Sequence, residues 1–272
     1  MVAIKFEAGE LEAKNVYKSF GRGKEALENV TFRVERGKFT VLCGPSGCGK
    51  TTLINLLAGY ILPDLGEVFL DGKPVKGPGW DRLVVFQESA LFPWKTVWDN
   101  IMFGPMVQGK DRKEAEEKTQ YLIDKVALTG FERKFPHQLS GGMQRRAELI
   151  RALINEPRVM LMDEPFRGLD AMTRELMQEH IIKLYEETKM TILFITAELE
   201  EAIYLGDVAY FMTVRPGTIK RRMDINLPRP RIYKHIATPE YVALEKTAIQ
   251  IVDEEAVKAF SQLRKVGAKP AA

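Results

Sequence analysis

Residues 44–51 read GPSGCGKT, and this run matches the phosphate-loop pattern of two glycines, a lysine and a serine or threonine at fixed spacing. An apolar run at residues 39–43 precedes the loop, and a helix-forming run at residues 50–58 follows it and stops at Gly59. A buried strand, a glycine-rich turn and a helix in this order direct backbone N–H groups at phosphate oxygens. A turn that binds no ligand is the alternative, and the flanking strand and helix argue against it. The residues predicted to contact phosphates or Mg²⁺ here are Gly44, Pro45, Ser46, Gly47, Cys48, Gly49, Lys50, Thr51 and Thr52.

Two of these side chains have specific roles in the motif. Lys50 adds a positive charge near the β- and γ-phosphates, and the Thr51 hydroxyl is a candidate Mg²⁺ ligand. An acidic pair, Asp163 and Glu164, ends the apolar run VMLM at residues 159–162. Ligands of α/β folds bind at the carboxyl ends of the strands, so Asp163 is placed to hold the metal and Glu164 to act as a general base. Buried strands often stop at acidic residues, and the phosphate loop upstream is what favours the functional interpretation.

The first third of the chain is rich in predicted strands. Residues 11–17 and 26–34 alternate and break at turns, which predicts a small antiparallel sheet that leads into a buried strand. Residues 67–70 reach Asp71-Gly72, a hairpin signal, and residues 82–86 predict another short strand.

The pattern of the remaining two thirds of the chain predicts an α/β fold with a helical insert. Residues 96–155 have helical periodicity, and the Pro-rich run at 227–231 marks a boundary. Two amphipathic helices are expected after it, at residues 239–250 and 253–264. Between the insert and the boundary, strands and helices alternate, which indicates a parallel sheet with both faces covered. The strands are expected at 159–162, 191–195 and 208–214, and the helices at 171–188 and 198–205.

Composition excludes several classes of protein. The chain has 272 residues, of which 45% are hydrophobic and 28% charged, as in folded globular proteins. Lys and Arg number 40 against 37 Asp and Glu, so the charge gives no reason to expect a nucleic-acid partner. Residues 51–63 are the longest run without a charge, shorter than the roughly 20 apolar residues of a spanning helix. Two cysteines, three scattered histidines and the absence of a signal-like start predict a cytosolic protein without a disulfide framework or a metal cluster.

A second anion-binding helix start lies at residues 139–144, LSGGMQ, where Ser140 is a candidate N-cap followed by Gly141 and Gly142. By itself this is usually only a capped helix. Together with the phosphate loop and the acidic pair, it resembles the signature motif of the ATP-binding subunits of ATP-binding cassette (ABC) transporters, and the resemblance covers residues 10–225.

The resemblance implies an α/β fold with a P-loop NTPase core, an antiparallel β subdomain and a helical signature subdomain at about residues 88–156. The nucleotide-binding domain would span residues 1–225, and residues 226–272 would form a C-terminal helical extension.

Further site residues follow from the family pattern. The aromatic residue that stacks on adenine matches Phe20, with Tyr17 as the nearby alternative, although an aromatic side chain is more often part of the core. Gln87 matches the Gln loop, which reaches Mg²⁺ and the attacking water and senses the membrane partner. The resemblance thus implies Lys50, Gln87 and Glu164 as catalytic residues, and Thr51, Gln87 and Asp163 as Mg²⁺ ligands.

A dimer is also implied. In such proteins ATP lies between the phosphate loop of one subunit and the segment that matches Ser140, Gly141 and Gly142 in the other. Asp170, in the run EPFRGLD at residues 164–170, matches the D-loop, which communicates across that interface. ATP closes such a dimer and hydrolysis opens it.

One position departs from the family. A histidine that contacts the γ-phosphate usually follows the strand that matches residues 192–196, and this chain has Ala197 there. A methyl group donates no hydrogen bond, and losing one donor to a transition-state charge commonly costs about 10²–10³ in rate. The expectation is slow ATP hydrolysis, or hydrolysis that needs another subunit, with binding less affected.

Within the family, residues 89–94, 164–166, 169–174, 215–217 and 227–231 are similar to the nitrate, sulfonate and taurine importer group. The resemblance implies a motor subunit that works with a second nucleotide-binding subunit, in a homodimer or a heterodimer, and with transmembrane permease subunits. A periplasmic or lipid-anchored solute-binding protein would be an indirect partner, and no nucleic acid is expected. The subunit would lie peripherally on the cytoplasmic face of the inner membrane, with residues 92–94 receiving a permease coupling helix unless they are core.

Two other functions compete with this interpretation. A regulatory ATP-binding subunit that hydrolyses poorly beside a competent ATPase would fit Ala197. A transport-independent ABC ATPase acting on DNA or ribosomes is disfavoured by the single nucleotide-binding domain and the balanced charge. A basic group, made of Lys220, Arg221, Arg222, Arg229, Arg231 and Lys234, is interpreted as a solvated face or, alternatively, as a contact with anionic lipid.

Overall fold

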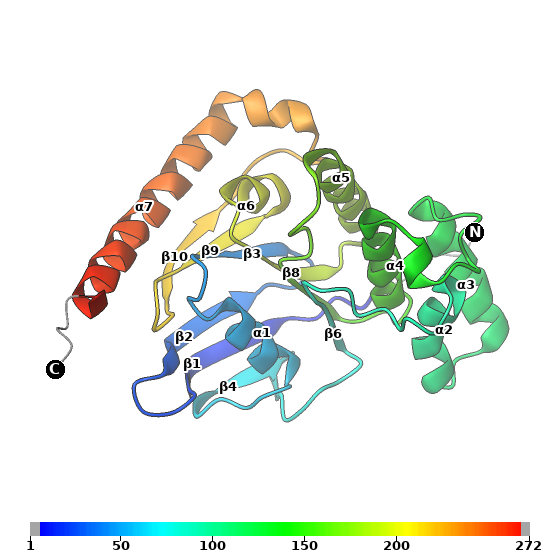
Figure 1. Cartoon of the computed structure of the whole chain (residues 1–272), viewed down its shortest axis with the longest axis horizontal. Helices are drawn as coiled ribbons and strands as arrows, with labels where there is room; N and C mark the ends of the chain where they lie inside the picture. Colours follow the sequence, from blue (N-terminus) through cyan, green and yellow to red (C-terminus); the bar gives the residue numbers. More distant parts are fainter. Residues whose placement is uncertain (1–5, 268–272) are drawn as a thin grey trace.

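The computed structural model describes the backbone of residues 6–267 and the side chains of residues 6–255. Two sheets and a group of helices make up the fold, with the helical part at one end of the molecule and the last helix at the other (Figure 1). The strands are β1 (Leu11–Ser19), β2 (Glu25–Val34), β3 (Phe39–Cys43), β4 (Leu65–Leu70), β5 (Lys73–Pro74), β6 (Arg82–Val85), β7 (Val159–Asp163), β8 (Thr191–Thr196), β9 (Val208–Met212) and β10 (Ile219–Asp224). The helices are α1 (Lys50–Ala58), α2 (Val97–Val107), α3 (Arg112–Lys125), the 3₁₀ turn η1 (Pro136–Gln138), α4 (Gly141–Leu153), α5 (Ala171–Thr188), α6 (Leu199–Leu205), the 3₁₀ turn η2 (Tyr233–Ala237) and α7 (Pro239–Gly267).

The larger sheet has the strand order β10-β9-β3-β8-β7-β6, and all neighbours except β10 and β9 run parallel. Its side chains alternate between two cores: Ile192 and Phe194 of β8 face one cluster, and Leu193 and Ile195 face the other. A sheet covered on both faces needs apolar residues at every position, and every residue of β3, β7, β8 and β9 is buried. The predicted parallel sheet is therefore confirmed, and β10 is an antiparallel edge strand that the sequence analysis missed.

The smaller sheet, β2-β1-β4-β5, is antiparallel throughout. Asp71 and Gly72 both have positive φ at the turn between β4 and β5, which confirms the predicted hairpin. Val16 and Phe32 from this sheet join the core that α1 also enters. The antiparallel sheet thus packs against the helix that follows the phosphate loop.

Helices α2, α3 and α4 form the predicted helical insert. Asp111 caps α3 and Thr96 caps α2, since each side chain accepts a backbone N–H in the first turn. Helix α4 contacts both α2 and strand β6, so the insert is attached to the edge of the parallel sheet.

The C-terminal extension differs from the expected helix pair. Residues 239–267 form one helix, α7, which runs along the side of the molecule opposite α2 and α3 (Figure 1). The expected break before Asp253 is absent because Ile251 and Val252 continue the apolar face of the helix. No Gly or Pro lies between the two expected segments to end the helix. Tyr241, Ala248 and Ile251 are 0–4% exposed in the main core, so the extension packs on the domain. The last five residues of the chain lie outside the described part.

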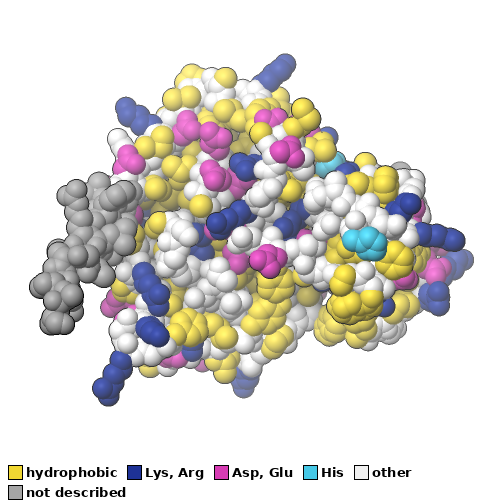
Figure 2. Space-filling model, viewed as in Figure 1, with side chains coloured by type: hydrophobic (Ala, Val, Ile, Leu, Met, Phe, Trp, Pro, Cys, Tyr) yellow, Lys and Arg dark blue, Asp and Glu magenta, His cyan; other side chains and the backbone are white. Residues whose placement is uncertain are grey.

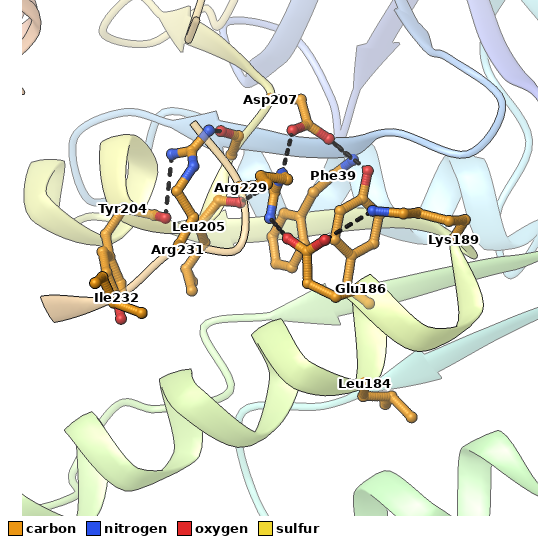
Figure 3. A network of polar contacts seen from close by, with 12 residues as sticks. Phe39, Leu184, Glu186, Lys189, Tyr204, Leu205, Asp207, Arg229, Arg231 and Ile232 are labelled. Carbon is orange, nitrogen blue, oxygen red and sulfur yellow. Dashed lines mark hydrogen bonds and ion pairs between the residues drawn. The ribbon is translucent and has the colours of Figure 1, made fainter. Parts of the chain in front are cut away.

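Two members of the basic group, Arg229 and Arg231, are held within the fold by polar contacts (Figure 3). Arg229 donates to Asp207 at 2.7 Å and to Glu186 at 2.9 Å. Arg231 is 4% exposed and donates to backbone carbonyls at the end of α6, among them Ile203. The lipid-facing alternative is wrong for these two arginines, because both side chains are mostly buried and bond to groups of the domain itself, in α5, at the end of α6 and at Asp207 just after α6. Acidic and basic side chains are also mixed over the face shown in Figure 2.

Candidate functional site

The phosphate loop connects β3 to α1 at the carboxyl edge of the parallel sheet. Gly49 is the N-cap of α1 with φ of 105°, a conformation that side-chain-bearing residues rarely adopt. A Cβ at this position would lie 2.8 Å from Leu27 Cδ2 and 2.9 Å from the carbonyl oxygen of Ala26. The motif therefore needs glycine here both for its backbone turn and for its approach to β2.

Lys50 is 5% exposed at the start of α1. Its ammonium group donates to the carbonyl oxygens of Gly44 and Pro45 at 2.8 and 3.1 Å, and it lies 3.5 Å from Glu164 Oε1. A buried ammonium needs such partners, because desolvation otherwise disfavours its charge. The loop thus holds one positive charge at its centre, at the position predicted to bind phosphate.

The acidic pair lies beside this charge. Asp163 ends β7 at 7% exposure, and burial raises the pKa of its carboxyl group, against the lowering effect of a hydrogen bond from Thr51. Glu164 has φ of 43°, in the left-handed region, and its backbone N–H donates to Ile195 of β8 at 2.9 Å. A residue other than glycine in this conformation costs of order 1–3 kcal/mol and is typical of functional sites. The turn directs Glu164 toward Lys50.

The Mg²⁺ ligands predicted from the sequence fit this arrangement. The Thr51 hydroxyl is already hydrogen bonded to the Asp163 carboxylate, so both oxygens lie together beside the loop. A hydroxyl and a carboxylate are hard oxygen ligands, which Mg²⁺ prefers. Gln87 lies two residues after the end of β6, and it lines the phosphate-loop cavity together with Thr51, whereas Asp163 does not line that cavity.

A cavity of about 280 Å³ contains the site. Of the predicted phosphate-loop residues, Ser46, Gly47, Gly49, Lys50, Thr51 and Thr52 line it, together with Phe20, Gln87 and Glu164. Gly44 and Pro45 contribute through the carbonyls that accept from Lys50. Cys48 is 1% exposed in the core, and burial raises its thiol pKa, so its side chain is structural.

Phe20 is the aromatic residue that reaches the cavity. It is 55% exposed at the end of β1 and lines the cavity, and Tyr17 does not line it. Arg215 also lines the cavity, and it donates to the backbone carbonyls of Glu25 and Lys24. Sequence reasoning missed Arg215, because only the parallel bridge from Leu27 to Gly217 brings its loop to β2.

The signature residues lie outside this cavity. Ser140 caps α4 by accepting from the Met143 N–H at 3.3 Å, and Ser140 and Gly141 are exposed. Asp170 caps α5 in the same way and is exposed as well, and Met172 beside it is 81% exposed. A second cavity, of about 210 Å³, adjoins the first and is lined by Ala197 and Glu198. Arg167, a residue that the sequence analysis did not assign, lines both cavities.

Comparison with known proteins identifies the family. The family model for ABC transporters matches residues 27–167. An uncharacterized ABC transporter ATP-binding protein of Methanocaldococcus jannaschii is 43% identical over 92% of this chain and 94% of its own length. A nitrate import ATP-binding protein of Synechocystis is 43% identical over 79% of this chain and 84% of that protein. A taurine import ATP-binding protein of Escherichia coli K12 is 38% identical over 92% of this chain and all of that protein.

Solved structures agree with the fold. A dimeric ATP-binding cassette in a post-hydrolysis state, bound to ADP and Pi, matches with a TM-score of 0.70 and 28% identity over 80% of this chain and 100% of that chain. A cassette of the cbiONQ transporter complex from Clostridium perfringens has a TM-score of 0.74 over 93% of this chain and 98% of its own, and at 22% identity it supports the fold alone. Among the described residues, no helix is long and apolar enough to cross a membrane. The chain belongs to the ATP-binding subunits of ABC transporters.

Proposed function

We propose that this subunit binds ATP with Mg²⁺ and hydrolyses it to drive import of a small solute, of the nitrate, sulfonate or taurine type, through a separate permease. The observation that carries the proposal is a cavity that unites Lys50, Gln87 and Glu164, in a chain that matches a taurine import ATP-binding protein over all of that protein's length.

Each group of the site has its own part in ATP binding or hydrolysis. Backbone N–H groups of the loop and the Lys50 ammonium bind the β- and γ-phosphates. Glu164 accepts a proton from the attacking water, and Gln87 orients that water. Thr51, Asp163 and Gln87 would hold Mg²⁺, which when bound neutralises phosphate charge. Phe20 offers a face for the adenine ring.

The same proposal includes a dimer. Ser140, Gly141 and Asp170 are exposed and lie outside the chain's own phosphate cavity. A second nucleotide-binding subunit would bring its signature segment to this ATP, and the ATP would bind between the two copies.

The loop that contains Gln87 would connect the permease-docking surface to the nucleotide site. Trp94 is 71% exposed, and the neighbouring Phe92 packs edge-on against Phe103 of α2 with ring centroids 4.9 Å apart. Phe92 and Phe103 line a cavity of about 180 Å³, which suits an apolar side chain of a coupling helix, and the Trp94 ring lies beside Phe92 with centroids 5.6 Å apart.

The loop between this surface and Gln87 is attached to the signature helix. Arg145 of α4 donates to the backbone carbonyls of Phe86 and Gln87, and Glu148 accepts from the Ala90 N–H. Movement of the docking surface would therefore move Gln87 and α4 together. The subunit would lie peripherally on the cytoplasmic face of the membrane, with a solute-binding protein as an indirect partner.

The test is steady-state ATP hydrolysis by the purified subunit with and without its permease, beside Glu164→Gln and Ala197→His. The proposal expects turnover in the wild type, loss of turnover in Glu164→Gln and a change of rate with permease.

A regulatory subunit is the second candidate, and the exposed methyl group of Ala197 favours it. That candidate expects ATP binding without turnover even with the permease, and turnover regained in Ala197→His.

A further inference from the structure

Arg167 lies where two cavities meet. The phosphate cavity and the cavity beside Ala197 share three lining residues, Ser46, Glu164 and Arg167. Arg167 belongs to the turn between β7 and α5, three residues after Glu164. Its guanidinium therefore borders both the phosphate loop and the space that Ala197 leaves open.

The contacts of Glu164 place a cation on each side of one carboxylate. Arg167 donates from Nη1 to Glu164 Oε2 at 2.9 Å, while Glu164 Oε1 lies 3.5 Å from Lys50 Nζ. One anionic group thus sits between the lysine of the phosphate loop and an arginine. A terminal phosphate, which carries more charge and more acceptor oxygens, is a stronger ligand for the same two cations.

Arg167 has the freedom to change partners. Its side chain is 61% exposed, whereas Glu164 is 15% exposed and Lys50 is 5% exposed. Water solvates most of this guanidinium, so exchanging the Glu164 oxygen for a phosphate oxygen costs little.

The neighbouring position lacks a donor. Ala197 follows β8 and presents only a methyl group to its cavity. Phosphoryl transfer spreads negative charge over the equatorial oxygens, and an arginine supplied by the same chain stabilises that charge in other nucleotide hydrolases.

We propose that Arg167 donates to the terminal phosphate of bound ATP and supplies the positive charge that Ala197 does not. The inference rests on the ATPase function proposed above. In the step, a water oxygen forms the new bond to the γ-phosphorus as the bond to the β,γ-bridging oxygen breaks. The water proton goes to Glu164, and the bonding electron pair leaves with ADP. When Arg167 turns to the phosphate it also releases Glu164 Oε2, which becomes free to accept that proton.

The experiment compares wild type, Arg167→Ala, Ala197→His and the double variant, with Arg112→Ala as the matched control. Arg112 is 79% exposed in an i,i+4 pair on α3, far in the fold from both cavities. Each protein is assayed for kcat in ATP hydrolysis and for affinity toward ATP and toward ADP.

We expect Arg167→Ala to lose about 10²–10³ in kcat. Its ATP affinity falls about tenfold or more, because a charge-assisted bond is lost. ADP affinity stays unchanged, since ADP has no γ-phosphate, and this unchanged affinity also shows that the variant is folded. Ala197→His in the Arg167→Ala background restores part of the rate, and Arg112→Ala matches wild type.

Two results overturn the inference: Arg167→Ala turning over within twofold of wild type, or ATP and ADP affinity falling by the same factor. Failure of the underlying function looks different. There wild type and Arg112→Ala do not hydrolyse ATP at all, or Glu164→Gln hydrolyses it as fast as wild type.

Discussion

Arg229→Ala tests whether the ion pairs of Figure 3 attach the C-terminal extension to the core. Arg229 bonds to Asp207, to Glu186 and to the carbonyl oxygen of Leu205, and its guanidinium lies 4.5 Å from the Tyr185 ring centroid. The substitution removes all of these contacts and leaves Asp207 with fewer partners.

The expected loss of unfolding free energy in Arg229→Ala depends on how deeply the ion pair is buried. Removing one partner of a fully buried pair costs about 3–5 kcal/mol. Arg229 and Asp207 are each 15% exposed, and Asp207 keeps hydrogen bonds from Tyr185 and from the Phe39 N–H. The cost therefore falls to about 2–3 kcal/mol of unfolding free energy, or a melting point lower by roughly 5–10 °C in a chain of this size.

Arg222→Ala is the matched control. Arg222 is 42% exposed, and its partners Glu35 and Asp224 are 36% and 51% exposed. An exposed pair contributes at most about 1 kcal/mol, so this variant loses a few degrees or less. Thermal melting followed by circular dichroism compares the two, and equal losses in both variants would refute the reasoning.

The pH dependence of the same network has a defined sign. Burial by itself would raise the pKa of Asp207, but hydrogen bonds from Tyr185 and Phe39 and the charge of Arg229 lower it overall. A carboxyl group with a lowered folded-state pKa stabilises the protein above its unfolded pKa of about 3.9, and that stability is lost as pH falls through the folded value. The difference in unfolding free energy between wild type and Arg229→Ala should therefore shrink as the pH falls. A difference that stays constant down to strongly acid pH would count against this assignment.

Two further predictions concern the nucleotide site and the permease surface. Phe20→Ala should weaken ATP binding about tenfold through lost stacking, and Tyr17→Ala should leave it unchanged, because only Phe20 lines the cavity; equal effects on a fluorescent ATP analogue would contradict the assignment of adenine to Phe20. Trp94→Ala should reduce the rise in ATPase rate that the permease produces, because its exposed ring lies on the proposed docking surface, and an unchanged response would remove it from that surface.

Local sequence was enough to predict the phosphate loop and most of the parallel sheet. The run before Gly44 forms β3 as expected, because buried strands and glycine-rich turns are encoded by neighbouring residues. The long-range partners were not predictable in this way. Arg229 and Arg231 belong to a basic run in sequence, and only the folded chain brings Asp207, Glu186 and the end of α6 to them.

The site likewise has residues that local motifs predicted and one that they did not. Lys50 and Glu164 were assigned from their motifs, and the structure places them 3.5 Å apart. Arg167 lies inside the run at residues 164–170, yet no motif marks it. The role proposed for it rests on its position between two cavities, which sequence spacing alone does not reveal.

Phosphate release at saturating ATP by wild type and by Glu164→Gln tests the ATPase assignment most directly. The account predicts sustained turnover in the wild type and tight ATP binding without turnover in Glu164→Gln, because the amide does not accept the water proton. Equal rates in the two proteins would contradict the role of Glu164, and no release from wild type even with its permease would contradict the motor function.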